Sequence, residues 1–275
     1  MNENFDPVTV LSFKEKDTSV VKASAPPVED ILMSRTLWPE SQKLYGHAFE
    51  IFCIAASHKG DCAASANKAK QEKYSDIIIW QIIQNQEDSD KQQSSVPACR
   101  LSGYQHLTVV QMEFAKNDMW LLACTRDRQV LLFKRTDAAS FEFSLHKRLK
   151  EAHTRIIWAL SWSHDDAFFA TASRENKKSV KIWSGVSAEE SKIAELSSEI
   201  PPGKVPCATS LQFFPDKVLD DSYALVIGLE SGAMSIWIHR QEGWTCSHTF
   251  ANFLTHGLTV RRIRFGRTEE KDGKK

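Results

Sequence analysis

Several residues in this chain are of the types that enzymes combine for nucleophilic catalysis. His106 is followed by Asp127, and His153 is followed by Ser161 and Trp183. A histidine that takes a proton from a serine, and is oriented by a carboxylate, is the arrangement of a catalytic triad. Similar sets recur along this chain, however, whereas a catalytic site would occur once. We therefore predict that these residues form structural hydrogen bonds and that the chain has no catalytic residue.

No motif for a metal or a cofactor accompanies these residues. The chain has nine histidines and six cysteines, but no C-x-x-C pair. It also lacks a phosphate-binding glycine loop and a nucleophile elbow. The sequence therefore predicts no metal, no cofactor and no small-molecule substrate. Most cysteines lie in apolar, strand-like stretches, so we expect reduced, buried thiols, as in cytoplasmic and nuclear proteins; they are Cys53, Cys62, Cys99, Cys124, Cys207 and Cys246.

Four arginines suggest a different chemistry, the binding of anions. Arg126 and Arg128 share one charged turn, Arg155 follows His153, and Arg174 begins another charged turn. The planar guanidinium group can bind a phosphate or a carboxylate with two hydrogen bonds. Because 35 basic residues balance 35 acidic ones, such a site must come from local clustering. The alternative is that these charges only keep the turns solvated.

The elements that hold these residues repeat along the chain. In the clearest copy, at 153–183, a histidine in a turn precedes an alternating strand and a polar corner. A second strand, a charged turn and a third strand ending in an aromatic residue follow. The closing aromatic recurs every 50 to 54 residues, at Trp80, Phe133, Trp183 and Trp237, and the opening histidines are His47, His106, His153 and His256. This period with short strands is typical of a WD40-type β-propeller.

The predicted fold is all-β, a partial WD40-type propeller with four full blades and the start of a fifth. Each blade is a small sheet, with its outer strand before its three inner strands. We expect blades at 36–82, 98–135, 141–184 and 193–239, and an incomplete one at 244–266. Residues 1–35 are expected to form a poorly ordered segment and linker, 82–96 an exposed connector, and 267–275 a charged tail. A longer chain or another polypeptide would complete the ring.

The topology of such a blade brings two of its turns to one face. These are the turn with the opening histidine and the turn between the second and third strands. Arg126, Arg128, Arg155 and Arg174 should therefore share a face, bordered by Lys68, Lys70, Lys73, Lys177 and Lys178. The hydrogen-bonded network inside the blades is expected to involve His47, His106, His153, Asp127, Trp80, Trp183 and Trp237, with Glu175 where an aspartate is usual.

Three runs go beyond a general WD40 pattern. They are LWPESQKLYGH at 37–47 with EIFC at 50–53, TRDR at 125–128, and HTRIIW at 153–158. Together they resemble the C-terminal half of the second subunit of the Elongator complex, over about residues 28–266. That family carries two propellers in tandem, so this chain resembles most of the second one. It departs from the family at its end, where the strands that would finish the fifth blade are absent.

The resemblance implies a non-catalytic scaffold subunit that supports the modification of wobble uridine in tRNA. The implied partners are the other Elongator subunits, both scaffold and catalytic. The basic face predicted from the arginines would bind an anionic partner, either the tRNA backbone or an acidic surface of another subunit. The alternative is a stand-alone RNA-binding WD40 protein. The first ten residues lack the pattern of a signal peptide, and no apolar run approaches a membrane span. We therefore expect a cytoplasmic and nuclear protein without a membrane partner.

Overall fold

The computed structural model describes residues 42–84, 93–175, 178–185, 192–196, 207–218, 221–250 and 257–266. The chain divides into two units, Met1–Ser41 and Gln42–Lys275, and all described residues belong to the second. The expected linker at 1–35, the tail at 267–275 and His256 lie outside the described residues. No helix in the described ranges is long and apolar enough to cross a membrane.

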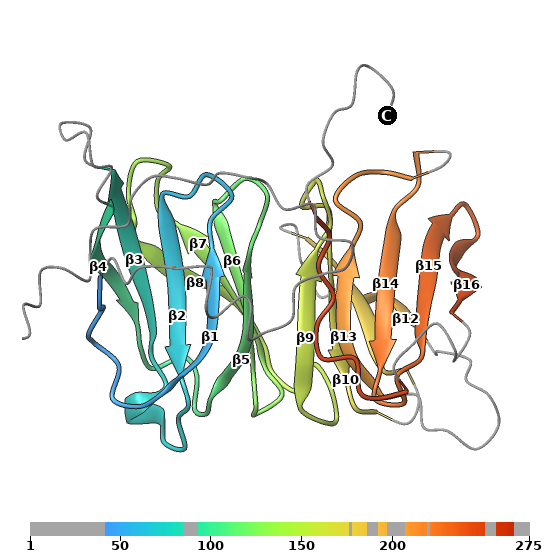
Figure 1. Cartoon of the computed structure of the whole chain (residues 1–275), viewed down its shortest axis with the longest axis horizontal. Coiled ribbons are helices and arrows are strands. Elements are labelled where there is room, and N and C mark those ends of the chain that lie inside the picture. Colours follow the sequence, from blue (N-terminus) through green and yellow to red (C-terminus); the bar gives the residue numbers. More distant parts are fainter. Residues whose placement is uncertain are drawn as a thin grey trace, which may run out of the picture. The chain divides into compact units, whose positions relative to one another are not determined.

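The described residues of this unit form four antiparallel sheets of four strands (Figure 1). The first sheet contains β1 (Ile51–Ala56), β2 (Cys62–Asn67), β3 (Ile77–Gln84) and β4 (Gln93–Leu101). The second contains β5 (Val109–Phe114), β6 (Trp120–Thr125), β7 (Val130–Arg135) and β8 (Phe143–Leu149). The third contains β9 (Ile157–Trp162), β10 (Phe168–Ser173), β11 (Val180–Ser184) and β12 (Lys192–Leu196). The fourth contains β13 (Ala208–Phe213), β14 (Ala224–Leu229), β15 (Met234–Arg240) and β16 (Gly243–Thr249).

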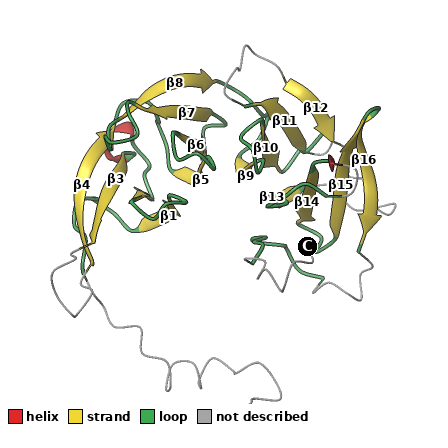
Figure 2. Ribbon diagram, turned by 90° about the horizontal axis from the view of Figure 1, so that it is seen from above, coloured by secondary structure: helices red, strands yellow, loops and turns green. Residues whose placement is uncertain are grey.

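This arrangement confirms the predicted all-β, WD40-type partial propeller. Within the unit, the sheets follow one another with β1, β5, β9 and β13 as their inner strands (Figure 2). Contacts between β1 and β5, between β5 and β9, and between β9 and β13 join each sheet to the next. One short 3₁₀ helix, Glu72–Tyr74, lies between β2 and β3.

The outer strands correct the sequence-based prediction. We expected each outer strand to join the three strands that follow it. Instead, β4 pairs with β3, β8 with β7, β12 with β11 and β16 with β15. The stretch predicted as an exposed connector therefore contains the end of β3 and the start of β4. A strand's own pattern shows that it forms, but its partner is decided by packing between distant residues.

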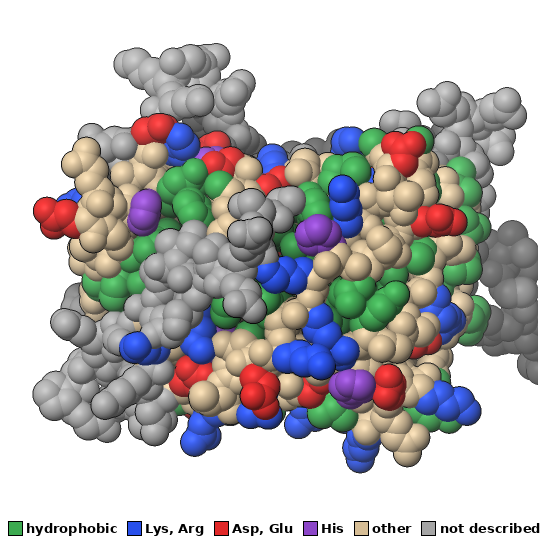
Figure 3. All heavy atoms as spheres, turned by 180° about the vertical axis from the view of Figure 1, so that it is seen from behind, with side chains coloured by type: hydrophobic (Ala, Val, Ile, Leu, Met, Phe, Trp, Pro, Cys, Tyr) green, Lys and Arg blue, Asp and Glu red, His purple; other side chains and the backbone are tan. Residues whose placement is uncertain are grey.

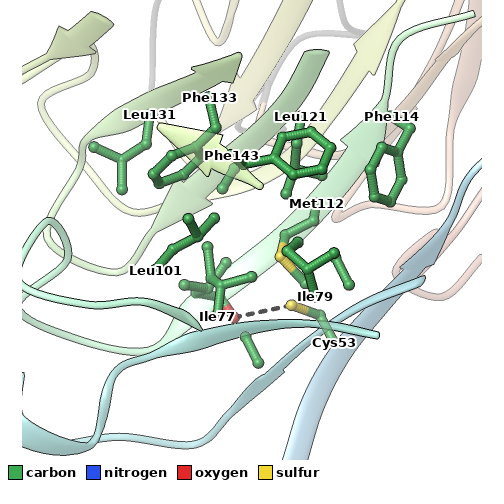
Figure 4. Close-up of a cluster of buried hydrophobic side chains, with 14 of the residues drawn as sticks. Cys53, Ile77, Ile79, Leu101, Met112, Phe114, Leu121, Leu131, Phe133 and Phe143 are labelled. Carbon is green, nitrogen blue, oxygen red and sulfur yellow. Dashed lines mark hydrogen bonds between the residues drawn. The ribbon is translucent and has the colours of Figure 1, made fainter. Parts of the chain in front are cut away.

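Three apolar clusters fill the spaces between neighbouring sheets. Between the first and second sheets, Ile77, Ile79, Met112 and Phe133 meet in one buried group (Figure 4). Small residues occupy the second strands where the sheets come close, and Ala64 and Ala123 are fully buried. This layered packing buries both faces of an inner sheet, which a single sheet cannot do alone.

The cysteines largely follow the prediction, with one clear exception. All six are free thiols, and four of them are buried. Burial raises the pKa of the Cys53 thiol to about 12, and its Sγ lies 3.3 Å from the carbonyl oxygen of Val109. Cys246 is exposed on β16 instead, because β16 is the outer strand of its sheet.

Aspartates tie neighbouring sheets together at the turns between first and second strands. Asp118 accepts the N–H groups of His58 and Lys59 at 2.7 and 2.9 Å. Asp166 likewise accepts the N–H groups of Lys116 and Asn117, at 2.6 and 3.1 Å. Both aspartates have a left-handed backbone, with φ of 57° and 63°. Glycine adopts this conformation most easily, and asparagine and aspartate, with their short polar side chains, come next.

Replacing Asp118 by asparagine should lower the free energy of unfolding by about 1–2 kcal/mol, since charge-assisted hydrogen bonds between sheets become neutral or are lost. Asparagine keeps the tolerance for a positive φ, so backbone strain changes little. Urea unfolding followed by tryptophan fluorescence measures the loss. Asp221→Asn is the matched control, because Asp221 has a φ of 59° but is exposed and pairs with Lys217. An equal loss in both variants would contradict the proposed tie.

The segment 257–266 packs beside β13 without forming a strand. The N–H of Val260 donates to the carbonyl of Leu229 at 3.1 Å, and Thr209 Oγ1 donates to the carbonyl of Val260 at 2.8 Å. Gly232, with φ of 86°, faces this segment so closely that a Cβ would lie 2.8 Å from Gly257 carbon. The prediction of an incomplete fifth blade at 244–266 therefore needs correction. Its first part lies in β16, which belongs to the fourth sheet, and the described residues 257–266 form no strand.

Candidate functional site

The clearest polar network lies in the third sheet, around the buried His153. Its Nε2 lies 2.8 Å from Thr171 Oγ1, to which Trp183 Nε1 donates at 2.9 Å. Its Nδ1 lies 3.3 Å from Glu175. The same carboxylate accepts the N–H of Thr154 at 2.5 Å and its hydroxyl at 2.9 Å. The network thereby fixes the turn before β9 onto the turn after β10.

Thr171 corrects the prediction that Ser161 would be the hydroxyl partner of His153. Thr171 lies on β10, where the pairing of β10 with β11 brings it next to Trp183. Ser161 lies on β9 and instead contacts Glu113 and Gln212. Thr171, His153 and Glu175 thus follow the order hydroxyl, imidazole, carboxylate of a triad. The Thr171 hydroxyl is fully buried, however, and also accepts the indole N–H of Trp183, which supports a structural role for the set.

The first sheet repeats this network in a shorter form. His47 Nε2 lies 2.8 Å from Ser65 Oγ, and Trp80 Nε1 donates to the same oxygen at 2.7 Å. Burial lowers the pKa of His47, and Arg100 lowers it further. Ser65 and Thr171 occupy equivalent positions on the second strands of their sheets. Recurrence at equivalent positions supports the structural interpretation.

The second and fourth sheets depart from it. We had predicted that His106 and Asp127 belong to one network, but the two do not meet. His106 Nδ1 lies 3.0 Å from Glu72, while Asp127 contacts Gln129. The position of Thr171 is taken by Ala123 in the second sheet, so no hydroxyl is present there. In the fourth sheet, Trp237 Nε1 donates to Ser235 on its own strand at 3.0 Å.

The four predicted arginines lie in neighbouring turns. Arg126 and Arg128 are in the turn between β6 and β7, Arg155 is in the turn before β9, and Arg174 follows β10. Arg128 Nη1 lies 3.5 Å from the carbonyl oxygen of Thr154, the residue next to Arg155. Arg155 and Arg174 both lower the pKa of Cys207, although burial of this thiol raises it overall.

Two of these arginines are paired with acids from adjacent turns. Arg128 forms an ion pair with Glu151 at 3.2 Å, and Arg174 forms one with Glu230 at 3.3 Å. The guanidinium of Arg174 also lies over the Trp158 ring, 5.0 Å from its centre. Arg126 and Arg155 are exposed. The two exposed arginines therefore offer their charge most directly to a partner.

Acidic side chains are interspersed among the basic ones along the lower edge in Figure 3. Lys68 and Lys70 are exposed, and the Lys73 ammonium lies 5.3 Å from the centre of the Tyr74 ring. Lys177 lies outside the described residues. The sequence pattern could locate these bases, but the pairing carboxylates Glu151 and Glu230 come from other turns and were missed. Among the described residues, no group of three metal-ligating side chains occurs.

Comparison with known proteins gives a consistent result. The family "WD domain, G-beta repeat" matches residues 144–184, a stretch that runs from β8 through β11. Elongator complex protein 2 of Rattus norvegicus is 36% identical over 256 residues, which is 87% of this chain and 29% of that protein. The Homo sapiens protein of that name is 32% identical over 269 residues, covering 90% and 31% of the two chains. The Arabidopsis thaliana protein is 34% identical over 255 residues, covering 89% and 28%.

The chain thus spans somewhat less than a third of the length of these relatives. The family resemblance that the motifs at 37–53, 125–128 and 153–158 predicted is confirmed. With four antiparallel sheets and a WD40 repeat, this is a WD40-repeat chain of the Elongator subunit 2 family.

Proposed function

We propose that this chain acts as a non-catalytic scaffold in an Elongator complex and supports modification of wobble uridine in tRNA through contacts with other subunits. The single observation that carries the proposal is its similarity to Elongator complex protein 2 over about nine-tenths of its length. The four sheets add a rigid framework with many exposed turns, which suits a protein that holds others together.

We further propose that Arg126 and Arg155 contact an acidic surface of another subunit. Both side chains are exposed, while Arg128 and Arg174 are held by Glu151 and Glu230. Mixed charges around them favour a protein surface of complementary pattern over a continuous phosphate backbone, which would be repelled by the interspersed carboxylates. Contact with tRNA is the second candidate, because arginine also binds phosphate well.

Charge reversal at both exposed arginines should reduce co-purification of the other subunits by about tenfold, because two like-charge contacts replace two attractive ones. Fold stability should change by less than about 0.5 kcal/mol, since both side chains lie in exposed turns. The measurement is affinity capture of the assembled complex with quantification of each subunit.

Arg240→Glu is the control, because Arg240 is exposed at the last residue of β15, at the end of its sheet opposite the arginine turns. Filter binding of tRNA at several salt concentrations separates the two candidates. A steep salt dependence that disappears in the double variant, with full retention of subunits, would replace the protein contact by an RNA contact. Unchanged subunit and tRNA binding would reduce the arginines to a solvated rim.

A further inference from the structure

A cavity of about 150 Å³ lies at the ends of the inner strands, on the face opposite the arginine turns. Glu113 from β5, Trp162 from β9 and Phe213 from β13 line it. Arg264 and Phe265, from the segment beside β13, form a further wall. With His58 from the turn after β1, five separate parts of the chain converge on a space that holds roughly one side chain.

Glu113 is the buried polar group of this cavity. Its Oε1 accepts weak hydrogen bonds from Ser161 Oγ and the N–H of Trp162, both at 3.3 Å. Its Oε2 is buried and has no hydrogen-bond partner among the described residues. Burial raises the pKa of Glu113 to about 7, although Arg264 opposes this change. A carboxyl group in this state readily carries a proton, and it then becomes a donor.

The other polar groups around the cavity are mainly donors. Arg264 contributes a guanidinium, which contacts Gln212 Oε1, and Lys116 is also among the lining residues. His58 and His164 also line the cavity, and His58 Nε2 lies 3.4 Å from the carbonyl oxygen of Phe114. The acids beside His164 are engaged elsewhere, since Asp165 accepts the Tyr223 hydroxyl and Asp166 accepts N–H groups of the second sheet.

We propose that this cavity is a docking pocket for an acidic side chain, Asp or Glu, of a partner protein. The incoming carboxylate would accept hydrogen bonds from Arg264 and Lys116 and share a proton with Glu113. Phe213, Phe214 and Pro215 would cover its apolar stem. A carboxylate fits better than a phosphate because it is smaller and brings less negative charge next to the Glu113 carboxyl.

This pocket is independent of the arginine turns, and its test does not require the assembled complex. The probe is N-acetylglutamate amide, added to the full 275-residue chain. The reporter is the NMR signal of the Trp162 indole N–H, which donates to the carbonyl of Glu113 at 3.2 Å. We expect a saturable shift with N-acetylglutamate amide and none with the neutral N-acetylglutamine amide.

Two substitutions give responses of opposite sign. Arg264→Gln should weaken binding of the probe by about tenfold, because it removes the charged donor. Glu113→Gln should strengthen binding by about threefold or more, because it removes a competing negative charge and keeps a donor. Lys150→Ala, in an exposed turn elsewhere, should leave binding unchanged. An unchanged indole signal of Trp237, which does not line the cavity and donates to Ser235, shows that the fold of the ligand-free variants is intact.

Three results would overturn the proposal. Binding of N-acetylarginine amide that is lost in Glu113→Gln would make the pocket a cation site. Inorganic phosphate that binds more tightly than the glutamate probe would make it a phosphate site. A Trp162 signal that responds to no probe would show that the pocket takes no such ligand.

Discussion

Replacing Arg135 by methionine is expected to lower the free energy of unfolding by about 3 kcal/mol, because it breaks a buried ion pair between two sheets. The Arg135 side chain is 1% exposed and lies 3.2 Å from Asp61 of the first sheet. Its Nε donates to the carbonyl of Ser140 at 2.5 Å, and its guanidinium lies 4.6 Å from the centre of the Phe141 ring. Methionine fills much of the space but offers no hydrogen bond to the Asp61 carboxylate or to the carbonyl oxygen of Ser140.

The expected loss lies at the lower end for buried pairs because the Asp61 side chain remains 30% exposed and can be hydrated. Urea unfolding of the variant, followed by tryptophan fluorescence, gives the value. Arg126→Met is the matched control, since Arg126 is exposed and should change stability by less than about 0.5 kcal/mol. A loss below 1 kcal/mol for Arg135→Met would show that the ion pair does not hold the two sheets together.

Replacing Glu175 by glutamine is expected to cost about 2–3 kcal/mol near neutral pH, because the His153 network loses its charge-assisted bonds. Glu175 is 7% exposed and contacts both His153 and Thr154. Glutamine keeps the shape and one acceptor, so the measured loss reports the charge. Glu142→Gln, on an exposed position, is the control.

The same carboxylate should make stability depend on pH. Burial alone raises the pKa of Glu175, but the hydrogen bonds from His153 and Thr154 lower it to about 2. A group with a lowered pKa in the folded state contributes its full stability above the unfolded pKa, about 4.3. This contribution should therefore be lost as the pH falls from about 5 towards 2, and Glu175→Gln should flatten that part of the profile. An identical acid profile in both proteins would contradict this assignment.

The sequence alone determined the class of the fold and the place of most strands. Alternating apolar residues and recurring aromatics are local signals, because side chains of a strand alternate between its two faces. Trp80, Trp183 and Trp237 thus marked three of the third strands, β3, β11 and β15. The motif at 37–47 is also a local signal, because its residues are contiguous in the chain, and it pointed to the Elongator family.

Only the tertiary structure decided which distant groups meet. The outer strands joined the preceding sheets, and Thr171 rather than Ser161 met His153, because pairing and register depend on residues far apart in the chain. Tertiary packing also decided the ion pairs of Arg128 and Arg174. It likewise formed the cavity lined by Glu113 and Arg264. Their partners come from different sheets and turns, so no local pattern in the sequence records them.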